Sequence, residues 1–268
     1  MNAADVPSLT QSFVLPTYSL WRREVVRFLR QRSRIVGALG TPLLFWLFIG
    51  SGLNRSFAPG GVSDTVSYLT YLFPGSIVLI ILFTAIFATI SVIEDRQAGF
   101  LQSVLAAPVD RSAIVMGKVL GSSTLAMIQA MLFLALAPLA GIPLSIGSIL
   151  AVLGVGLIVS LALSALGLQL AWRIGSTQGY HAVMNLVLIP MWLLSGAFFP
   201  STGASKWVSW MMAVNPLTYG VAAMRHALYW GSSDLAPSTP SFGLSLSVTV
   251  VFAAVMIGLA TRTVATRS

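Results

Sequence analysis

The sequence has no cysteine, only two histidines and few charged residues. Of its 268 residues, 8% are charged and seven are acidic. The absence of cysteine excludes disulfides, thiolate metal sites and cysteine nucleophiles. His181 and His226 each lack a second possible ligand three or four residues away and lack a nearby acid. We therefore expect no metal site.

The sequence also lacks the motifs of nucleotide-binding enzymes. Lys118 follows Gly117, but no Gly-x-x-x-x-Gly-Lys-Ser/Thr loop and no Gly-x-Gly-x-x-Gly turn is present. A rhomboid-type serine protease is disfavoured because Lys206 replaces the second glycine of its Gly-x-Ser-Gly motif beside Ser205. We expect neither enzymatic activity nor a cofactor in this chain.

Long apolar runs dominate what is present. Hydrophobic residues make up 56% of the chain, and the mean hydropathy is +0.88. Several runs reach the roughly 20 residues that cross a hydrocarbon core of about 30 Å. The sequence predicts an all-α polytopic membrane protein, with a flexible tail over residues 1–17 and a single transmembrane domain over 18–268. The six predicted spans are Val36–Leu53, Leu72–Ile93, Ala113–Leu139, Ile149–Trp172, Ala182–Phe199 and Phe242–Ala260.

The net charge of +8 is interpreted as membrane topology and not as nucleic-acid binding. With the N-terminus in the cytosol, twelve of the 15 basic residues fall on the cytosolic side. These are Arg22, Arg23, Arg27, Arg30, Arg32, Arg34, Arg96, Arg111, Lys118, Arg173, Arg262 and Arg267, against Arg55, Lys206 and Arg225 outside. The bias predicts that both termini are cytosolic. The expected location is a bacterial cytoplasmic membrane.

A basic amphipathic helix is predicted over Tyr18–Arg34, before the first span. Trp21, Val25, Phe28 and Leu29 share one face of this helix. Arginines occupy much of the rest, namely Arg22, Arg23, Arg27, Arg30 and Arg34. Such a helix lies at the membrane interface as an anchor. A surface that also contacts a cytosolic partner is the alternative.

The middle of each predicted span carries no charge. Lys118 lies about one turn inside the third span, and we expect it to reach back to the cytosolic surface. The interior polar residues are neutral: Thr84, Thr89, Ser123, Thr124, Gln129, Gln169 and Asn185. Ion coupling within this chain is therefore not expected. The small-residue pattern Gly117-x-x-x-Gly121, like Gly156, Ser160 and Ser164, indicates close helix packing within one bundle more than a dimer interface.

Charge concentrates in the cytosolic loop between spans two and three. Residues 97–106 predict a short helix that Gly99 loosens at its start and Pro108 ends, with Asp110 as the N-cap of the next span. The helix is too short to cross a membrane, and its apolar residues are expected to be exposed: Phe100, Leu101, Val104 and Leu105. Docking of a partner and contact with the bilayer surface both remain possible interpretations.

The segment from Ser205 to Trp230 is apolar, but the pair Asn215-Pro216 breaks it. Each half is too short to span, so we expect two short interfacial or re-entrant helices on the outer side. The aromatic residues there suit a belt at headgroup level: Trp207, Trp210, Tyr219, Tyr229 and Trp230.

Five stretches occur in a characteristic order along the chain. The cytosolic loop carries Glu94, Gly99, Leu101, Leu105, Pro108, Arg111, Gly117 and Lys118. The other four are TPLLFWLFIG from Thr41, LFPGSIV from Leu72, LSGAFFP from Leu194 and NPLTYGVAAMR from Asn215. Together they resemble the signatures of the type-2 ATP-binding-cassette (ABC) exporter permeases. The resemblance runs from Trp21 to Ala260, with one departure at 204–206, where a proline commonly precedes the tryptophan.

The resemblance implies a role as the membrane half of an exporter. Two copies, or one copy with a similar permease, would pair with two separate ATP-binding subunits that carry ATP and magnesium. The implied contact with those subunits is Glu94, Arg96, Gly99, Phe100, Leu101, Val104, Leu105, Pro108 and Arg111, aided by Trp21, Arg22, Arg23, Val25, Phe28 and Arg30 of the interfacial helix. The implied outer re-entrant residues are Trp207, Asn215, Pro216, Tyr219 and Arg225. Spans one, two and five would line the route.

Neutral, Met- and Phe-rich spans favour an amphiphilic drug or lipid-like substrate. A polysaccharide is the alternative within the same family. A membrane scaffold that transports nothing, and an ion-coupled carrier or channel, are the interpretations outside it.

Overall fold

The computed structural model describes residues 13–53, 67–202, 204–230 and 239–266. Within these ranges the secondary structure is entirely helical, and six helical segments are long and apolar enough to cross a membrane. The predicted helical architecture with six spans is thus confirmed. Arg55, Arg267 and most of the predicted tail lie outside the described residues.

Five of the spans are continuous helices: α2 (Arg32–Gly52), α3 (Tyr68–Gln97), α5 (Arg111–Leu134), α6 (Ile146–Arg173) and α11 (Phe242–Thr266). The third span was predicted to reach Leu139, but α5 ends at Leu134. The short 3-10 helix η2 (Ala137–Ala140) follows it. Pro138 lies within this turn and has no N–H to donate to a continuing α-helix.

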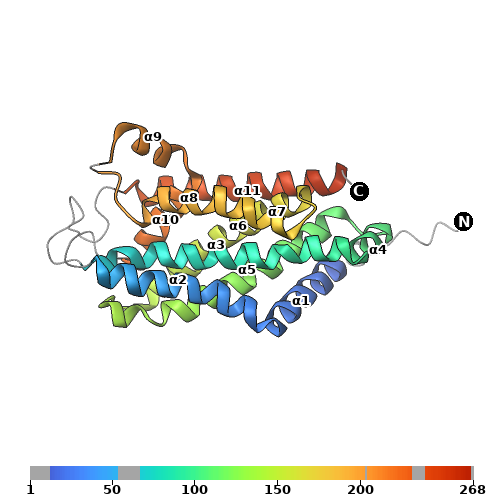
Figure 1. Cartoon of the computed structure of the whole chain (residues 1–268), viewed down its shortest axis with the longest axis horizontal. Coiled ribbons are helices and arrows are strands. Elements are labelled where there is room, and N and C mark those ends of the chain that lie inside the picture. The colour runs from blue at the N-terminus through green and yellow to red at the C-terminus, as the bar shows by residue number, and fades with distance from the viewer. Residues whose placement is uncertain (1–12, 54–66, 203, 231–238, 267–268) are drawn as a thin grey trace, which may run out of the picture.

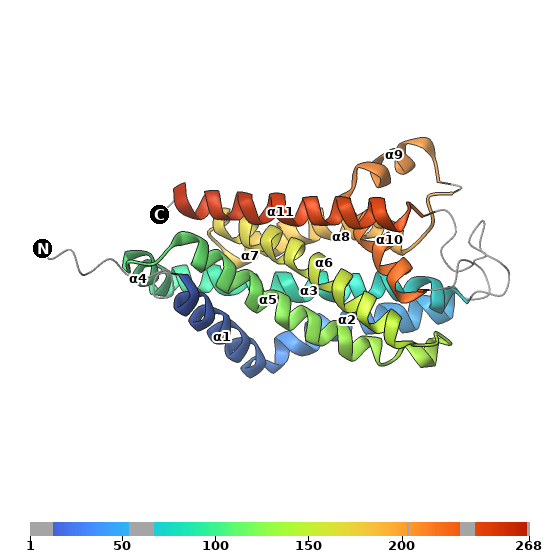
Figure 2. The same ribbon diagram turned by 180° about the vertical axis from the view of Figure 1, so that it is seen from behind.

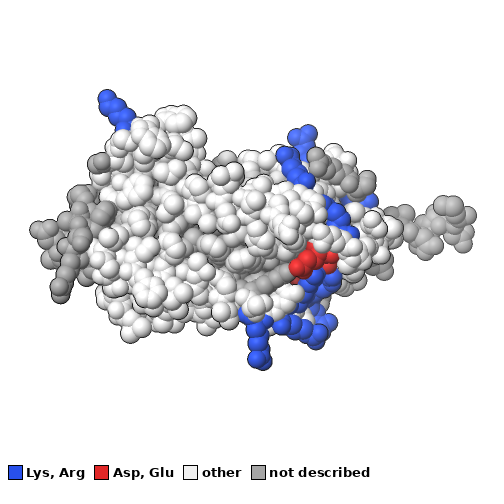
Figure 3. All heavy atoms as spheres, in the orientation of Figure 1, with Lys and Arg blue, Asp and Glu red and all other residues white. Residues whose placement is uncertain are grey.

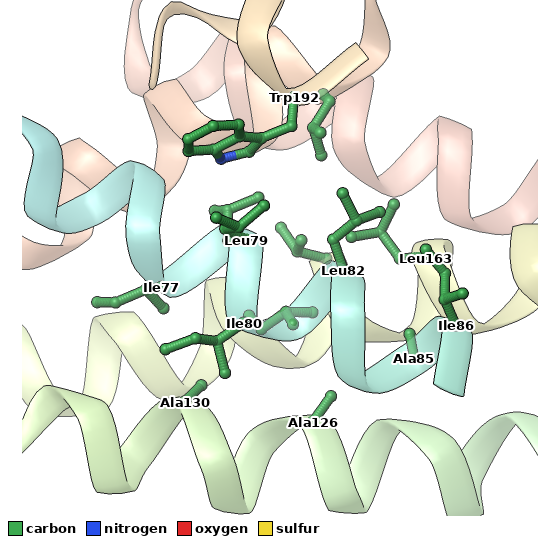
Figure 4. Packing of buried hydrophobic residues seen from close by; sticks show 14 of the residues in the cluster. Ile77, Leu79, Ile80, Leu82, Ala85, Ile86, Ala126, Ala130, Leu163 and Trp192 are labelled. Carbon is green, nitrogen blue, oxygen red and sulfur yellow. The ribbon is translucent and has the colours of Figure 1, made fainter. Parts of the chain in front are cut away.

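Helix α3 is the centre of the bundle (Figures 1 and 2). The span window of α3 is 89% buried, whereas that of α11 at the periphery is 17% buried. A helix that is apolar all round is suited to such a central place. In Figure 4, Ile77 and Ile80 of α3 face Ala130 and Ala126 of α5, while Trp192 approaches α3 from the opposite side.

The fifth span is broken into four short pieces: α7 (Thr177–Val183), the π-helical η3 (Met184–Leu188), α8 (Ile189–Trp192) and the π-helical η4 (Leu193–Ala197). It ends where Gly196 adopts φ +78°, which side chains disfavour. Trp192 Nε1 donates a hydrogen bond of 2.9 Å to Gly75 O of α3. A Cβ on Gly75 would lie 2.5 Å from Ala197 Cβ, so glycine permits this close approach.

Two short helices follow the fifth span, α9 (Lys206–Val214) and α10 (Pro216–Leu228). The chain breaks between them at Asn215, as predicted, and the Asn215 side chain accepts a hydrogen bond of 3.0 Å from Leu217 N. Helix α9 stands away from the bundle, whereas α10 packs against α6 and α11 (Figure 1). The prediction was wrong for Tyr229, which is buried and donates to Thr70 O at 2.6 Å instead of joining a surface belt.

Helix α1 (Leu15–Arg30) lies against α5 and begins three residues before the predicted start. Its buried face is Leu20, Glu24 and Phe28, which are spaced four residues apart. The apolar face predicted for this helix was wrong for Leu29, which is 50% exposed. Gln31 leaves helical geometry at φ −97° and ψ 78°, and α2 starts at the next residue.

Basic side chains gather at one end of the bundle, with acidic atoms among them (Figure 3). Both the start of α1 and the end of α11 lie at this end (Figure 1). The short helix α4 (Phe100–Ala106), between α3 and α5, lies there too. We call this end of the bundle the charged end, and the opposite end of the bundle the outer end.

Candidate functional site

The C-terminal turn of α3 directs three consecutive charged residues to different neighbours. Successive residues on a helix point about 100° apart. Asp95 points inward and is 2% exposed. Glu94 is partly exposed and pairs with α1. The Arg96 guanidinium reaches α6, where it donates to Trp172 O at 2.8 Å.

Lys118 of α5 is buried beneath this turn. Its Nζ lies 2.6 Å from Asp95 Oδ2 and also contacts Glu24 Oε1 of α1. Ser91 Oγ donates to the other oxygen of Glu24 at 2.6 Å. The expectation that Lys118 reaches the cytosolic surface was therefore wrong. Two inward-facing carboxylates stabilise the ammonium inside the protein, so it has no need to extend to water.

Helix α1 adds two arginines to the same carboxylates. Arg23 holds Asp95 through two hydrogen bonds of 2.7 and 2.8 Å. Arg27 contacts Asp95 at 2.7 Å and Glu94 at 2.6 Å. The hydrogen bonds to the Asp95 carboxylate raise the pKa of Arg23 above its ordinary value. We call Arg23, Glu24, Arg27, Glu94, Asp95 and Lys118 the charge network.

The charge network contains three cations and three carboxylates, so it is formally neutral. Replacing a buried ion pair by apolar residues is often neutral, but removing one partner alone costs about 3–5 kcal/mol. The network therefore fixes the relative position of α1, α3 and α5 more than it adds net stability.

Two glycines of α5 allow α1 to approach closely enough for these contacts. A Cβ on Gly117 would lie 2.7 Å from Leu20 Cβ, and a Cβ on Gly121 would lie 2.7 Å from Glu24 Cβ. Real Cβ atoms do not pack at such distances. The small-residue pattern on this span therefore serves packing within one chain, as expected, and α1 is the helix that it receives.

Helix α4 is connected to the charge network through Phe100. The Arg23 guanidinium carbon lies 3.7 Å from the centroid of the Phe100 ring, a cation–π contact. Gly99 precedes the helix with φ +75°. Such a turn suits glycine because a side chain there is strained.

The prediction of an exposed apolar ridge on α4 was wrong for Leu101. Leu101 is 3% exposed and points into the core, while Phe100, Val104 and Leu105 are partly buried. The outward face of α4 is instead Gln102, Ser103 and Ala106, followed by the exposed Pro108. The mistake arose because the sequence shows that these side chains are apolar, but not whether they contact a partner protein or other helices of the same chain.

A shallow groove of about 320 Å³ runs between α4 and the end of α6. It is lined by Arg96, Leu101, Gln102, Leu105 and Trp172. Three of these residues, Arg96, Leu101 and Leu105, belong to the contact with ATP-binding subunits that the sequence resemblance implied. The groove is therefore a recess at the charged end, directly beside α4.

The loop after α4 is held by two local contacts. Arg111 donates to Leu105 O at 2.8 Å. Asp110 caps α5, as predicted, by accepting from Ser112 N at 2.8 Å and from Ser112 Oγ at 2.6 Å. These hydrogen bonds lower the pKa of Asp110 below its ordinary value.

The remaining interfacial residues take different places. Trp21 Nε1 donates to Thr124 Oγ1 of α5 at 3.0 Å, and Val25 packs against Phe28. Arg22 and Arg30 are exposed. Trp21, Val25 and Phe28 are therefore part of the bundle, and Arg22 and Arg30 remain on the surface of α1.

The outer residues lie at the opposite end. Trp207 is exposed on α9, whereas Asn215 and Pro216 form the turn into α10. Tyr219 donates to Ala213 O at 2.9 Å. Arg225 is 2% exposed and lies inside the bundle. These residues do not join the charged end, and among the described residues no acidic or histidine cluster could hold a metal ion.

Glu24 and Asp95 are the functional candidates that sequence reasoning missed. Glu24 is a single acid among the arginines of an amphipathic helix, and Asp95 is the second residue after an apolar span. Lys118, one turn inside another span, was the signal that could have identified them. A cation at that depth requires partners, and few acids are available in this chain.

Comparisons with known proteins identify the family of this chain. A model of the ABC-2 type transporter family matches residues 16–229. The putative transport permease ycf38 of Porphyra purpurea is 26% identical over 211 residues, covering 78% of this chain and 72% of the relative. Nodulation protein J of Rhizobium leguminosarum bv. viciae is 26% identical over 210 residues, covering 77% and 80%. The probable doxorubicin resistance ABC transporter permease protein DrrC of Mycobacterium tuberculosis is 25% identical over 220 residues, covering 80% and 76%.

The family match covers α1, the charge network, α4 and the outer helices up to Tyr229. All of the predicted contact residues lie within it. The chain is a multi-pass permease without ATPase activity of its own, and it belongs to the ABC-2 type transporter family.

Proposed function

We propose that this permease is the membrane subunit of an ATP-driven exporter with two permeases and two ATP-binding subunits. Permeases of this family pair with ATP-binding subunits. The second permease is a copy of this chain or a similar permease. The charged end faces the cytosol of a bacterium, with both termini on that side, in keeping with the positive residues gathered there (Figure 3).

The observation that carries the proposal is the continuity of contacts at the charged end. The ring of Phe100 on α4 lies under Arg23 of α1, and Arg23 holds Asp95 of α3. Lys118 of α5 holds the same carboxylate. Movement of α4 by an ATP-binding subunit therefore acts on α1, α3 and α5 together. Coupling between distant sites is carried by such chains of packed side chains and ion pairs when they can adopt two arrangements.

The proposed docking surface is the outward face of α4 with the groove beside it. Gln102, Ser103 and Ala106 present exposed side chains there. The groove of about 320 Å³ offers Arg96 and Trp172 at its wall. In this arrangement Leu101 and Phe100 transmit the movement from within the bundle, and the partner contacts their neighbours.

An amphiphilic drug or lipid-like molecule is the proposed substrate. The spans are apolar, and the described ion pairs lie at the charged end. One relative is named for doxorubicin resistance, which supports a drug-like substrate for this chain. The alternatives are export of a polysaccharide and a scaffold role without transport. The following experiment distinguishes both from export of a drug-like molecule.

The test reconstitutes the permease with its ATP-binding subunit in proteoliposomes and measures ATP-dependent doxorubicin uptake into inside-out vesicles. Glu94→Lys and Gly99→Trp are expected to insert normally and to lose at least tenfold in uptake. Gly141→Trp is the matched control, because Gly141 also has a positive φ and open space around it but lies away from α4.

Full uptake in Glu94→Lys and Gly99→Trp would overturn the coupling proposal. ATPase stimulation by a polysaccharide and not by doxorubicin would replace the substrate class. Absence of any stimulated ATPase activity in the complex would favour the scaffold.

A further inference from the structure

Arg225 of α10 is a buried arginine at the outer end, 2% exposed. Its Nη2 donates to Gly196 O at 3.2 Å and to Tyr71 O at 3.4 Å. Its guanidinium carbon lies 4.0 Å from the centroid of the Tyr71 ring. All of these partners are neutral. They connect α10 to α3 and to the end of the fifth span.

The charge of Arg225 has no described counter-ion. Every described ion pair lies in the charge network at the other end of the molecule, and among the described residues no carboxylate lies within ion-pair distance of Arg225. A guanidinium does not give up its proton to relieve the cost of burial. It must find an anion or water instead.

The guanidinium also retains unused donors. Arginine has five N–H groups in a fixed planar arrangement. Nη2 makes the two hydrogen bonds described above, and Nε is buried without any acceptor. Buried donors left unsatisfied are rare in folded proteins, and one on a charged group calls for a ligand.

A small cavity adjoins the arginine. Its volume is about 30 Å³, and its lining includes Tyr71, Ser195, Gly196, Thr218 and Arg225. One water molecule needs roughly 10–15 Å³, so the cavity has room for about two waters or a single small ion.

We propose that this cavity binds a chloride ion, held by the guanidinium of Arg225. The ion would neutralise the buried charge and give the unused donors an acceptor. Because Arg225 contacts Gly196 and Tyr71, the bound ion would fix α10 against α3 and the end of the fifth span. The inference stands apart from the proposed transport function, since it concerns ion binding by the permease itself.

The test follows thermal unfolding of the purified permease in detergent, through the fluorescence of its seven tryptophans. Sodium chloride is compared with sodium gluconate at constant ionic strength. We expect a saturable rise in Tm of about 2–4 °C in chloride, because a ligand that binds only the folded state stabilises it. Broadening of the ³⁵Cl NMR signal by the folded protein is the second readout.

Arg225→Gln is expected to abolish both the Tm shift and the line broadening. Lys206→Gln, which removes an exposed charge on α9 near the same end, is the matched control and should retain both. If Arg225→Gln fails to fold, Arg225→Lys takes its place: it keeps the charge but loses the planar set of donors, so both readouts should weaken, and an unchanged Tm shift would overturn the proposal. Equal Tm values in chloride and gluconate and no ³⁵Cl broadening by the unaltered protein would overturn the proposal. The same result is expected if a carboxylate of the chain is the counter-ion of Arg225.

Discussion

Lys118 and Asp95 lie 2.6 Å apart, on different spans and almost completely buried. Lys118 also holds Glu24 of α1. The pair therefore connects three helices at the end of the molecule that carries α4. Asp95 also binds Arg23, whose guanidinium lies against Phe100 of α4, so this pair is joined to the proposed coupling contacts.

Replacing Lys118 by methionine is expected to destabilise the permease by about 3–5 kcal/mol, because the buried Glu24 then loses its nearest cation and keeps only Arg23 at 3.6 Å. Thermal unfolding in detergent measures the loss. The double variant Lys118→Met with Glu24→Leu should recover part of it, since both buried charges are then gone. Lys206→Met on the exposed α9 is the control and should stay within about 0.5 kcal/mol. A wild-type Tm for Lys118→Met alone would contradict the network.

Gly121→Ala tests the packing of α1 on α5. The new Cβ would lie 2.7 Å from Glu24 Cβ, so α1 must move away, at a cost of about 1–3 kcal/mol. Gly154→Ala is the control, because nothing lies within 4 Å of a Cβ there. It should be neutral or stabilising by up to about 1 kcal/mol, as expected for glycine inside a helix. Equal thermal stability of the two variants would show that α1 is not tightly packed.

The two faces of α4 should respond differently to substitution. Leu101→Ala removes a buried side chain and should cost about 2–5 kcal/mol of stability. Gln102→Ala changes an exposed residue, so we expect unchanged stability and weaker stimulation of the partner's ATPase activity. Thermal unfolding and ATPase assays on the complex measure the two effects. A stable Leu101→Ala together with a fully stimulating Gln102→Ala would contradict the assigned orientation of α4.

Asp110→Ala should destabilise the permease by about 1 kcal/mol at neutral pH, through loss of the N-cap of α5. The pKa of Asp110 is lower in the folded protein than its ordinary value. The charge of Asp110 therefore stabilises the folded state when the pH is above the ordinary pKa of an aspartate. This stabilisation is lost as the pH falls through the lowered pKa of the folded protein.

The Asp110→Asn variant separates the cap from the charge. Asparagine also caps helices well. The difference in Tm between wild type and Asp110→Asn should therefore shrink on acidification below about pH 4. A difference that stays constant between pH 7 and pH 3 would show that the Asp110 charge contributes nothing.

The apolar runs were enough to predict the spans, because a hydrocarbon core requires long helices whatever their neighbours are. The sequence also predicted the cap at Asp110 and the break at Asn215. Its errors at Lys118, Leu101 and Tyr229 share one cause. Each side chain can lie either at the surface or inside the bundle, and the position of a helix distant in the sequence decides which. Glu24 shows the same limit, since its partners lie on α3 and α5.

The interruption at Gln31 separates two helices that are adjacent in the chain. Helix α1 is attached by ion pairs and close packing to α3 and α5, whereas α2 continues into the bundle after a non-helical residue. We expect bending at this joint to let α1 move with the charged end while α2 keeps its own tilt. We therefore expect a spin label on α1 to report the nucleotide cycle with a larger amplitude than one on α2.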